Sequence, residues 1–300
     1  MQEKKQFEKI NDALLIRAPA KINLSLLVAG KRADGFHNLK TIMAKINWFD
    51  EVLIEKNIKK GITLVNKGPY WAPAGKKNLV CRACKLILEH AQTSADLRIT
   101  LTKNIPAGTG LGSASSDAAA TLLGVNKFLG LGLGRGVLKK IAAMLGSDVA
   151  FFLNGPLAFC TSKGEKVKKI EKKFNFLAIL VVPDVTSSTK TVYGNYRHDD
   201  RLFKVLSLQI NKLMVKNKID LIVGLCANML QDSCFGLYKG IEKIKNKVES
   251  LGIKPLCLSG SGSTLYYIIE NRDRKKALMF QQKLTDNVGC KSIIVSSNRW

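Results

Sequence analysis

Glycine and serine residues crowd the stretch PAGTGLGSASSDAAA at positions 106–120, which leads into a segment with helical spacing. Glycines at 108, 110 and 112 allow backbone N–H groups to approach an anion closely, because no Cβ stands in the way. The following helix adds unpaired N–H donors and the positive end of its dipole, and Ser115 or Ser116 can cap it. The stretch therefore predicts a phosphate site, although a flexible loop before a helix has a similar composition.

The spacing of this loop excludes two common nucleotide-binding motifs. The P-loop pattern G-x-x-x-x-G-K-[ST] occurs nowhere in the chain. The glycines follow G-x-G-x-G instead, and the next segment lacks the strand–helix–strand context of a dinucleotide-binding fingerprint. The remaining interpretation is a kinase that binds its nucleotide through a different motif.

Lys21 and Asn23 lie in APAKINLSLL (18–27), which otherwise reads as a buried strand. Its apolar positions 22, 24 and 26 alternate with its polar positions 21, 23 and 25, so the two sets are expected on opposite faces of a sheet. The polar face could contact either bulk water or a ligand.

Two more segments carry groups suited to chemistry. Asp148 in LGSDVAFFLNG (145–155) follows a predicted helix end, where a turn residue and a functional carboxylate are alternatives. LSGSGSTLY (258–266) predicts a tight glycine turn between strands, which by itself indicates a hairpin rather than a site.

The chain has 300 residues, 46% of them hydrophobic, and a formal net charge of +25. The charge favours anionic partners, but the lysines are spread out, and we interpret the densest run, KGEKVKKIEKK (163–173), as a solvated surface. No apolar run reaches the roughly 18 residues of a membrane span, and the N-terminal region lacks a signal peptide's apolar core. We therefore expect a cytoplasmic protein with no membrane partner.

Seven cysteines, scattered along the chain, predict a reducing compartment rather than a disulfide framework. Cys81 and Cys84 form a single C-x-x-C pair within a predicted helix, without the second pair that a zinc site requires. The three histidines lie far apart in sequence, so we expect no metal held in a protein cage.

The predicted elements form an α+β protein with a boundary near residue 157, between an N-terminal domain (1–157) and a C-terminal domain (158–300). Strands are expected in the segments 14–30, 40–56, 96–104, 176–183, 254–270 and 290–297. Helices are expected over 78–91, 118–129, 135–146, 203–217, 219–231, 237–250 and 273–285.

In their order along the chain, these motifs resemble those of the GHMP kinase superfamily: P-A-K-x-N-L, P-x-x-x-G-L-G-x-x-x-S and S-G-S/T-G. The chain has PAKINL at 19–24, PAGTGLGSASS at 106–116 and SGSG at 259–262. Three further segments resemble the branch that phosphorylates the 2-hydroxyl of 4-diphosphocytidyl-2-C-methyl-D-erythritol, in the non-mevalonate isoprenoid pathway. They are RADGFHNLKTIM (32–43), GSDVAFFLNG (146–155) and PDVTSSTKTVYGNY (183–196), and the resemblance as a whole covers about residues 14–268.

The resemblance implies a fold and a set of roles. The fold is a two-domain GHMP kinase, with a ribosomal protein S5 domain 2-like N-terminal domain, a ferredoxin-like α+β C-terminal domain and the site in the cleft between them. ATP is the implied phosphoryl donor, Mg²⁺ is carried on its phosphates, and Lys21 and Asp148 are the catalytic pair. The residues assigned to the substrate are Asn23, Phe36, His37, Thr189 and Tyr193. The residues assigned to ATP are Lys103, Pro106, Ala107, Gly108, Thr109, Gly110, Leu111, Gly112, Ser113, Ala114, Ser115 and Ser116.

The loop departs from the family's usual G-G-G-L-G-G-G-S-S at Ser113 and Ala114, which bring side chains near the expected phosphates. Two alternatives stay open. One is another small-molecule kinase of the superfamily, such as a homoserine or mevalonate kinase, against which DGFH and PDVTSSTKTVY argue. The other is a non-catalytic nucleic-acid-binding protein on a related fold, suggested by the charge. We expect a small-molecule substrate and no nucleic acid, and either a monomer or a weak homodimer.

Overall fold

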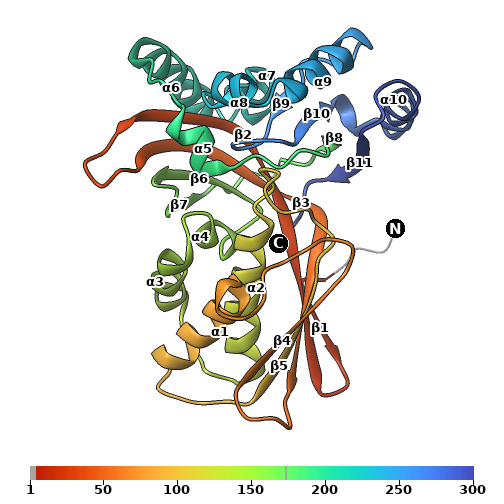
Figure 1. Ribbon diagram of the computed structural model, residues 1–300. Coiled ribbons are helices and arrows are strands. Elements are labelled where there is room, and N and C mark those ends of the chain that lie inside the picture. The colour runs from red at the N-terminus through yellow and green to blue at the C-terminus, as the bar shows by residue number, and fades with distance from the viewer. Residues whose placement is uncertain (1–4, 173) are drawn as a thin grey trace.

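The computed structural model describes residues 5–172 and 174–300, which form two sheets covered by helices (Figure 1). The strands are β1 (Phe7–Ile10), β2 (Ala13–Lys31), β3 (His37–Lys56), β4 (Ile62–Lys67), β5 (Leu97–Thr102), β6 (Leu157–Ser162), β7 (Lys166–Lys169), β8 (Leu177–Val182), β9 (Cys257–Leu258), β10 (Leu265–Ile269) and β11 (Lys291–Ser296). The helices are α1 (Leu79–His90), α2 (Ser113–Phe128), α3 (Arg135–Leu145), α4 (Val149–Phe152), α5 (Thr189–Gly194), α6 (Asp200–Val215), α7 (Ile219–Gly224), α8 (Gln231–Leu237), α9 (Lys239–Ser250) and α10 (Arg274–Asn287), with short 3₁₀ turns at Gly75–Lys77 and Glu270–Arg272.

The first sheet has the strand order β1-β2-β3-β5-β4, and β6 extends it along β3 and carries β7. All of its pairs are antiparallel except β4 with β5. Helices α1 to α4 lie together against one face of this sheet (Figure 1). The sequence of α1 explains this placement, because its buried positions 80, 83, 84, 87 and 88 follow the spacing of one helical face. Cys84 of the C-x-x-C pair is one of these packing residues.

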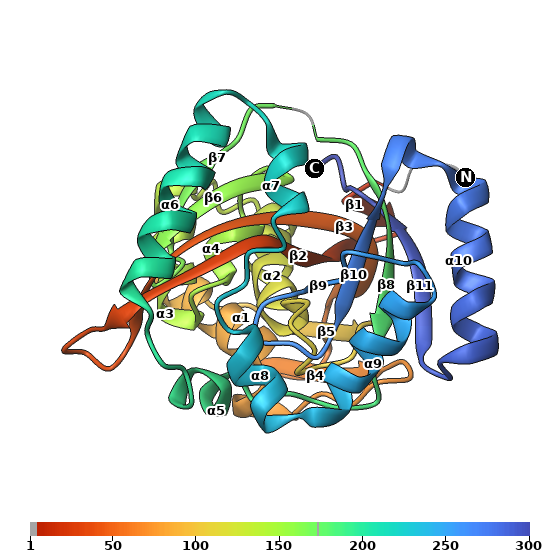
Figure 2. The same cartoon turned by 90° about the horizontal axis from the view of Figure 1, so that it is seen from above.

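The second sheet has the order β11-β8-β10-β9, with all pairs antiparallel. Every residue of β8, LAILVV, is buried, which accounts for its unbroken apolar sequence. Helix α10 runs alongside β11 of this sheet (Figure 2), and α7, α8 and α9 lie together above β9 and β10 in the view of Figure 1. Among the helices that the structure describes, none is long and apolar enough to cross a membrane.

The long strand β2 belongs to both hydrophobic cores. Its first half, including Ile16 and Ala18, packs with α1 and α2, whereas its second half, including Ile22 and Leu24, packs with residues of the second sheet. The change from one sheet to the other falls between Lys169 and Leu177, later than the predicted domain boundary at residue 157, where β6 begins.

Two expectations are wrong around residue 226. The helix predicted over 219–231 is interrupted between α7 and α8, because Cys226 adopts a left-handed conformation (φ 44°) and the following residues pair with β2. Leu26 N–H donates to Ala227 O at 2.7 Å, and Met229 N–H donates to Leu26 O at 2.9 Å. In addition, Cys226 and Cys257 form a disulfide, although the cysteine pattern predicts none.

Carbonyl oxygens hold one fully buried lysine. Lys45 on β3 is 1% exposed, and its Nζ donates to Phe152 O at 3.1 Å and to Asn154 O at 2.6 Å, at the end of α4. Burial, with a smaller contribution from the charge of Arg135, lowers the pKa of Lys45 to about 7. This lysine therefore connects α4 to β3 through hydrogen bonds, and its burial makes the charged form less favourable.

We expect Lys45→Met to alter how stability depends on pH. Between the folded pKa of about 7 and the ordinary value of 10.5, the native protein binds fewer protons than the unfolded chain, so the free energy of unfolding of the wild type should rise with pH. In Lys45→Met this rise should be smaller. Urea titrations at several pH values between about 7 and 10.5 measure the free energy of unfolding, with the exposed Lys85→Met as control. Parallel profiles for Lys45→Met and the wild type would contradict the assignment.

Candidate active site

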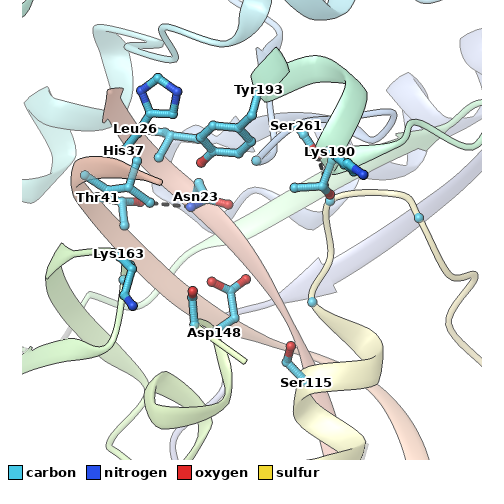
Figure 3. Close-up of a pocket in the computed structure, with 18 of the residues that line it drawn as sticks. Asn23, Leu26, His37, Thr41, Ser115, Asp148, Lys163, Lys190, Tyr193 and Ser261 are labelled. Atoms are coloured by element: carbon cyan, nitrogen blue, oxygen red, sulfur yellow. Dashed lines mark hydrogen bonds between the residues drawn. The ribbon is translucent and has the colours of Figure 1, made fainter. Parts of the chain in front are cut away.

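A cavity of about 870 Å³ lies where the two sheets meet. It is lined by β2 and β3, by the glycine loop (residues 106–112) with the start of α2, and by the residues before α4. The turn between β6 and β7, helix α5 and the SGSG turn (residues 259–262) complete its walls. Figure 3 shows Asp148 and Ser115 on one side of this cavity and the rings of His37 and Tyr193 on the other. The elements come from both halves of the chain, so the cavity exists only in the folded protein.

Lys21 and Asp148 meet inside the cavity. The Nζ atom of Lys21 lies 3.7 Å from Asp148 Oδ2 and donates a hydrogen bond to Asn23 Oδ1 at 2.5 Å. Lys21 is only 4% exposed, and burial lowers its pKa, an effect that the nearby carboxylate of Asp148 partly opposes. An ammonium and a carboxylate, both aimed into one cavity, can stabilise negative charge and accept a proton side by side.

The carboxylate of Asp148 is not used to cap the helix that follows it, α4. Asp148 occupies the N-cap position of this helix, but its side chain makes no capping hydrogen bond. Its backbone is helical (φ −80°, ψ −13°), and the turn is instead closed by Val149 N–H, which donates to Gly146 O at 3.2 Å. About a third of the side chain of Asp148 remains exposed, at 36%. The interpretation of Asp148 as a turn residue is thus correct for its backbone, while its carboxylate lines the cavity.

The glycine loop presents amide groups to the cavity. Its carbonyls are occupied elsewhere: Gly108 O accepts from Ser187 N–H, Thr109 O from Thr264 N–H, and Leu111 O from Lys21 N–H, at 2.9 to 3.1 Å. In the part of the chain that the structure describes, none of the amides from Gly108 to Ser115 donates a backbone hydrogen bond. Free amides at the start of a sixteen-residue helix, with its dipole behind them, form a site for an anion.

Close contacts require glycines in the glycine loop and in the SGSG turn. Gly108, Gly110 and Gly112 all have positive φ, between 69° and 78°. A Cβ on Gly110 would stand 2.0 Å from Ser259 O, so this glycine lets the glycine loop pack on the SGSG turn. A Cβ on Gly112 would approach Lys21 Cγ to 3.0 Å, and one on Gly260 would approach Lys21 Nζ to 3.3 Å.

Three predictions about the loop need correction. Helix α2 begins at Ser113 with Gly112 as its N-cap, so Ser115 and Ser116 lie inside its first turn and do not cap it. Ser115 lines the cavity, but the hydroxyl of Ser116 is buried away from it. Lys103 does not line the cavity either. It is 2% exposed, and its Nζ bonds to Asp50 and Asp117 behind the loop, because a buried ammonium requires carboxylate partners.

The five predicted substrate residues, Asn23, Phe36, His37, Thr189 and Tyr193, all line the cavity. Asn23 is held at both ends of its amide, since Oδ1 accepts from Lys21 and Nδ2 donates to Thr41 Oγ1 at 2.8 Å. The hydroxyl of Thr189 lies 3.0 Å from that of Ser261 in the SGSG turn. Polar groups from β2, α5 and this turn therefore converge on one space.

Aromatic rings form the opposite wall. His37 lies 5.8 Å from Tyr193 and 5.6 Å from Tyr196, centroid to centroid. Its Nδ1 lies 2.9 Å from Ala29 O, which can only accept, so Nδ1 carries the proton and Nε2 of the neutral ring is an acceptor. Phe36 is 53% exposed, and the ammonium of Lys163 sits 4.8 Å from its ring centroid. Phe36 thus has an open face at the mouth of the cavity.

Several cavity residues do not follow from the sequence patterns: Leu26, Lys31, Thr41, Lys163, Lys190, Tyr196, His198 and Ser261. Leu26 is expected on the apolar face, but register shifts in the pairing of β2 with β3 after Asn23 and after Val28 break the alternation. Lys163 belongs to the lysine run interpreted as solvated surface, although its position in the turn between β6 and β7 makes it part of the cavity lining. Ser261 belongs to the SGSG motif, whose pattern by itself indicates only a turn.

The described cavity lining contains Lys21, Lys31, Lys163 and Lys190 but only one carboxylate, that of Asp148. This excess of positive charge suits a polyanionic ligand. Within the described residues, no group of three histidine, cysteine or acidic side chains lies close enough to hold a metal ion.

Comparison with known proteins agrees with this geometry. The family model described as "GHMP kinases N terminal domain" matches residues 78–156, and "GHMP kinases C terminal" matches residues 211–281. The 4-diphosphocytidyl-2-C-methyl-D-erythritol kinase of Bacillus cereus (strain B4264) is 37% identical over 265 residues, covering 87% of this chain and 90% of that protein. The kinase of the same name from Bacillus cytotoxicus is 36% identical over 264 residues, with the same coverage.

Solved structures show the same relationship. A crystal structure of 4-(cytidine 5'-diphospho)-2C-methyl-D-erythritol kinase superposes with a TM-score of 0.74 at 28% identity, covering 95% of this chain and all of that one. Homoserine kinase from Cytophaga hutchinsonii superposes equally well, with a TM-score of 0.75, but at 21% identity over 99% and 98% of the two chains. The fold alone therefore does not distinguish between these two kinases, whereas the sequence identity to the curated relatives does. The chain belongs to the GHMP kinases and, within them, to the family of 4-diphosphocytidyl-2-C-methyl-D-erythritol kinases.

Proposed function

We propose that this protein transfers the γ-phosphoryl group of ATP to the 2-hydroxyl of 4-diphosphocytidyl-2-C-methyl-D-erythritol. The observation that carries the proposal is the pairing of Lys21 and Asp148, 3.7 Å apart, in the same cavity as the free amides of the glycine loop. A proton acceptor, a positive charge and an anion site are the parts that transfer of a phosphoryl group to an alcohol needs.

Asp148 is the proposed base. Its carboxylate accepts the proton of the substrate hydroxyl while the hydroxyl oxygen forms a bond to the γ-phosphorus and the bond to ADP breaks. Lys21 lies close enough to stabilise the negative charge on the oxygens of the transferring group. The Oδ1 atom of Asn23 accepts a hydrogen bond from the Lys21 ammonium and so restricts the positions that the ammonium can adopt.

The glycine loop is the proposed site of the ATP phosphates, for which its unpaired amides and the α2 dipole supply donors and positive potential. Magnesium fits as an ion brought in by the nucleotide, because Asp148 is the only carboxylate among the described cavity residues and Ser115 adds a hydroxyl oxygen. Such an ion supplies charge neutralisation on the phosphates, and its other ligands would be phosphate oxygens and water.

The aromatic wall is the proposed site of the cytosine base. Phe36 and Tyr193 offer ring faces for stacking, and the acceptor Nε2 of His37 matches the exocyclic amine of cytosine, which is a donor. Stacking accepts any base, so the His37 edge is the feature that favours cytosine. The diphosphate of the substrate would then lie among the cavity lysines.

An activity assay tests the proposed function directly. The purified protein, with ATP and Mg²⁺, should release ADP in the presence of 4-diphosphocytidyl-2-C-methyl-D-erythritol and not with homoserine or mevalonate. Phosphorus NMR of the product should show a new monophosphate ester on the 2-oxygen. Turnover of homoserine or mevalonate instead, or of no alcohol at all, would refute the proposal.

We expect Asp148→Asn to keep its fold and its affinity for ATP but to lose turnover by about 10²–10⁴-fold, because the amide cannot accept the proton. Steady-state kinetics, nucleotide titration and a thermal melt measure these effects together. Asp286→Asn on α10, an acid outside the cavity lining, is the matched control and should behave as the wild type. Turnover by Asp148→Asn within a few-fold of the wild type would remove Asp148 from the role of base.

The aromatic wall gives a prediction about specificity. Tyr193→Ala and Phe36→Ala should each raise the KM for the cytidine substrate about five- to 150-fold, because a stacked base loses roughly 1–3 kcal/mol with one ring. The KM for ATP should stay unchanged. Trp71→Ala, an exposed aromatic outside the cavity lining, serves as control. Equal changes in both constants would mean that the rings serve the core rather than the base.

A further inference from the structure

A cluster of buried charged and polar groups lies behind the glycine loop. It consists of Asp50 on β3, Lys103 after β5, and Ser113 and Asp117 on α2, and we call it the loop clamp. All four residues are buried, with Lys103 only 2% exposed. Lys103 Nζ bonds to Asp50 Oδ2, to Ser113 Oγ and, at 2.7 Å, to Asp117 Oδ2. Among these residues only Ser113 also lines the cavity.

One carboxylate of the loop clamp holds both ends of the loop. Asp50 Oδ1 accepts from the backbone N–H groups of Asn104 at 2.6 Å and Ile105 at 2.8 Å, immediately before Pro106. Asp50 Oδ2 accepts from Ser113 Oγ at 2.8 Å, at the first residue after the loop. The two oxygens of a single side chain therefore set the separation between the entry and the exit of the loop.

The loop clamp places one lysine against two buried carboxyl groups. Burial raises the pKa of Asp117, an effect that the charge of Lys103 partly offsets. For Lys103, burial lowers the pKa, but the carboxylates of Asp117 and Asp50 outweigh it and raise the pKa overall. Buried ion pairs of this kind contribute little net stability compared with apolar packing, so stability alone does not explain the cluster.

We propose that Asp50 and Lys103 are positioning residues that hold the glycine loop in the shape in which its amides can bind the phosphates of ATP. The inference rests on the proposed function, since it assigns the loop to the nucleotide. Neither residue contacts the cavity, and both act through the backbone of 104–105 and through the start of α2. Lys103, predicted to touch the nucleotide, acts instead by keeping Asp50 in place.

The test compares variants by calorimetric titration with ATP and Mg²⁺ in the absence of the second substrate. Asp50→Asn replaces one carboxylate oxygen with an amide N–H₂ group, a donor, beside groups that donate to Asp50. Lys103→Met removes the ammonium. Each should weaken the Kd for ATP about ten- to a hundredfold, because a small misplacement of binding groups has effects of this size. The KM for the cytidine substrate should change little. Ile87→Ala, a buried residue of α1 outside the loop clamp, should lower the Tm without changing the Kd for ATP.

A double variant separates positioning from charge balance. Asp50→Asn combined with Lys103→Met removes one charge of each sign, so the net charge of the loop clamp stays as in the wild type. It should melt closer to the wild type than either single variant and still bind ATP at least tenfold more weakly. A wild-type Kd in the folded double variant would overturn the positioning role. Absence of ATP binding by the wild type itself would refute the proposed function instead.

Discussion

The burial of the Lys21 ammonium is the constraint on which the rest of the site depends. An ammonium that is 4% exposed must find acceptors inside the protein, and Lys21 finds Asn23 and Asp148. The two glycine turns then close around it. Gly112 and Gly260 lack the Cβ that would stand 3.0 Å from Lys21 Cγ and 3.3 Å from Lys21 Nζ. Gly112 and Gly260 belong to motifs that are 148 positions apart in the sequence. Both are glycines at positions where a Cβ would crowd the side chain of Lys21.

The cavity has two chemically different walls. On one side, backbone amides of the glycine loop stand beside Asp148, and this wall is suited to groups that carry negative charge. On the other side, His37, Tyr193 and Phe36 offer rings and a hydrogen-bonding edge, which are suited to a flat heterocycle. Backbone amides are fixed by the fold and need no side-chain ordering when a phosphate binds, whereas recognition of a base requires side chains of particular shape. The division matches a reaction between a nucleotide and a nucleotide-linked alcohol.

The strand β2 explains why these walls meet where they do. Its first half is part of the core under α1 and α2, and its second half is part of the core of the second sheet, so Lys21 and Asn23 lie at the junction of the two. The bridge from Ala227 and Met229 to Leu26 ties the second half of β2 to the segment between α7 and α8. Behind the loop, Asp50 on β3 joins the same sheet to both ends of the glycine loop. The cavity is therefore built on the longest pair of strands in the described structure.

The sequence by itself determined the parts whose signal is local. Helix α1, helix α10 and strand β8 follow from the spacing and apolar content of their own residues. The resemblance of the ordered motifs to those of the GHMP kinases predicts Lys21, the glycine loop and Asp148 as site residues. Only the tertiary structure decided what depends on partners distant in the chain. The predicted helix over 219–231 is interrupted because its middle pairs with β2, and Leu26 reaches the cavity because the register of β2 shifts. Lys103 does not line the cavity because Asp50 and Asp117, 53 and 14 residues away, satisfy its charge in the interior. The spacing of residues within one element does not reveal such partners. The position of a buried charge depends on the oppositely charged and hydrogen-bonding groups that the fold places next to it.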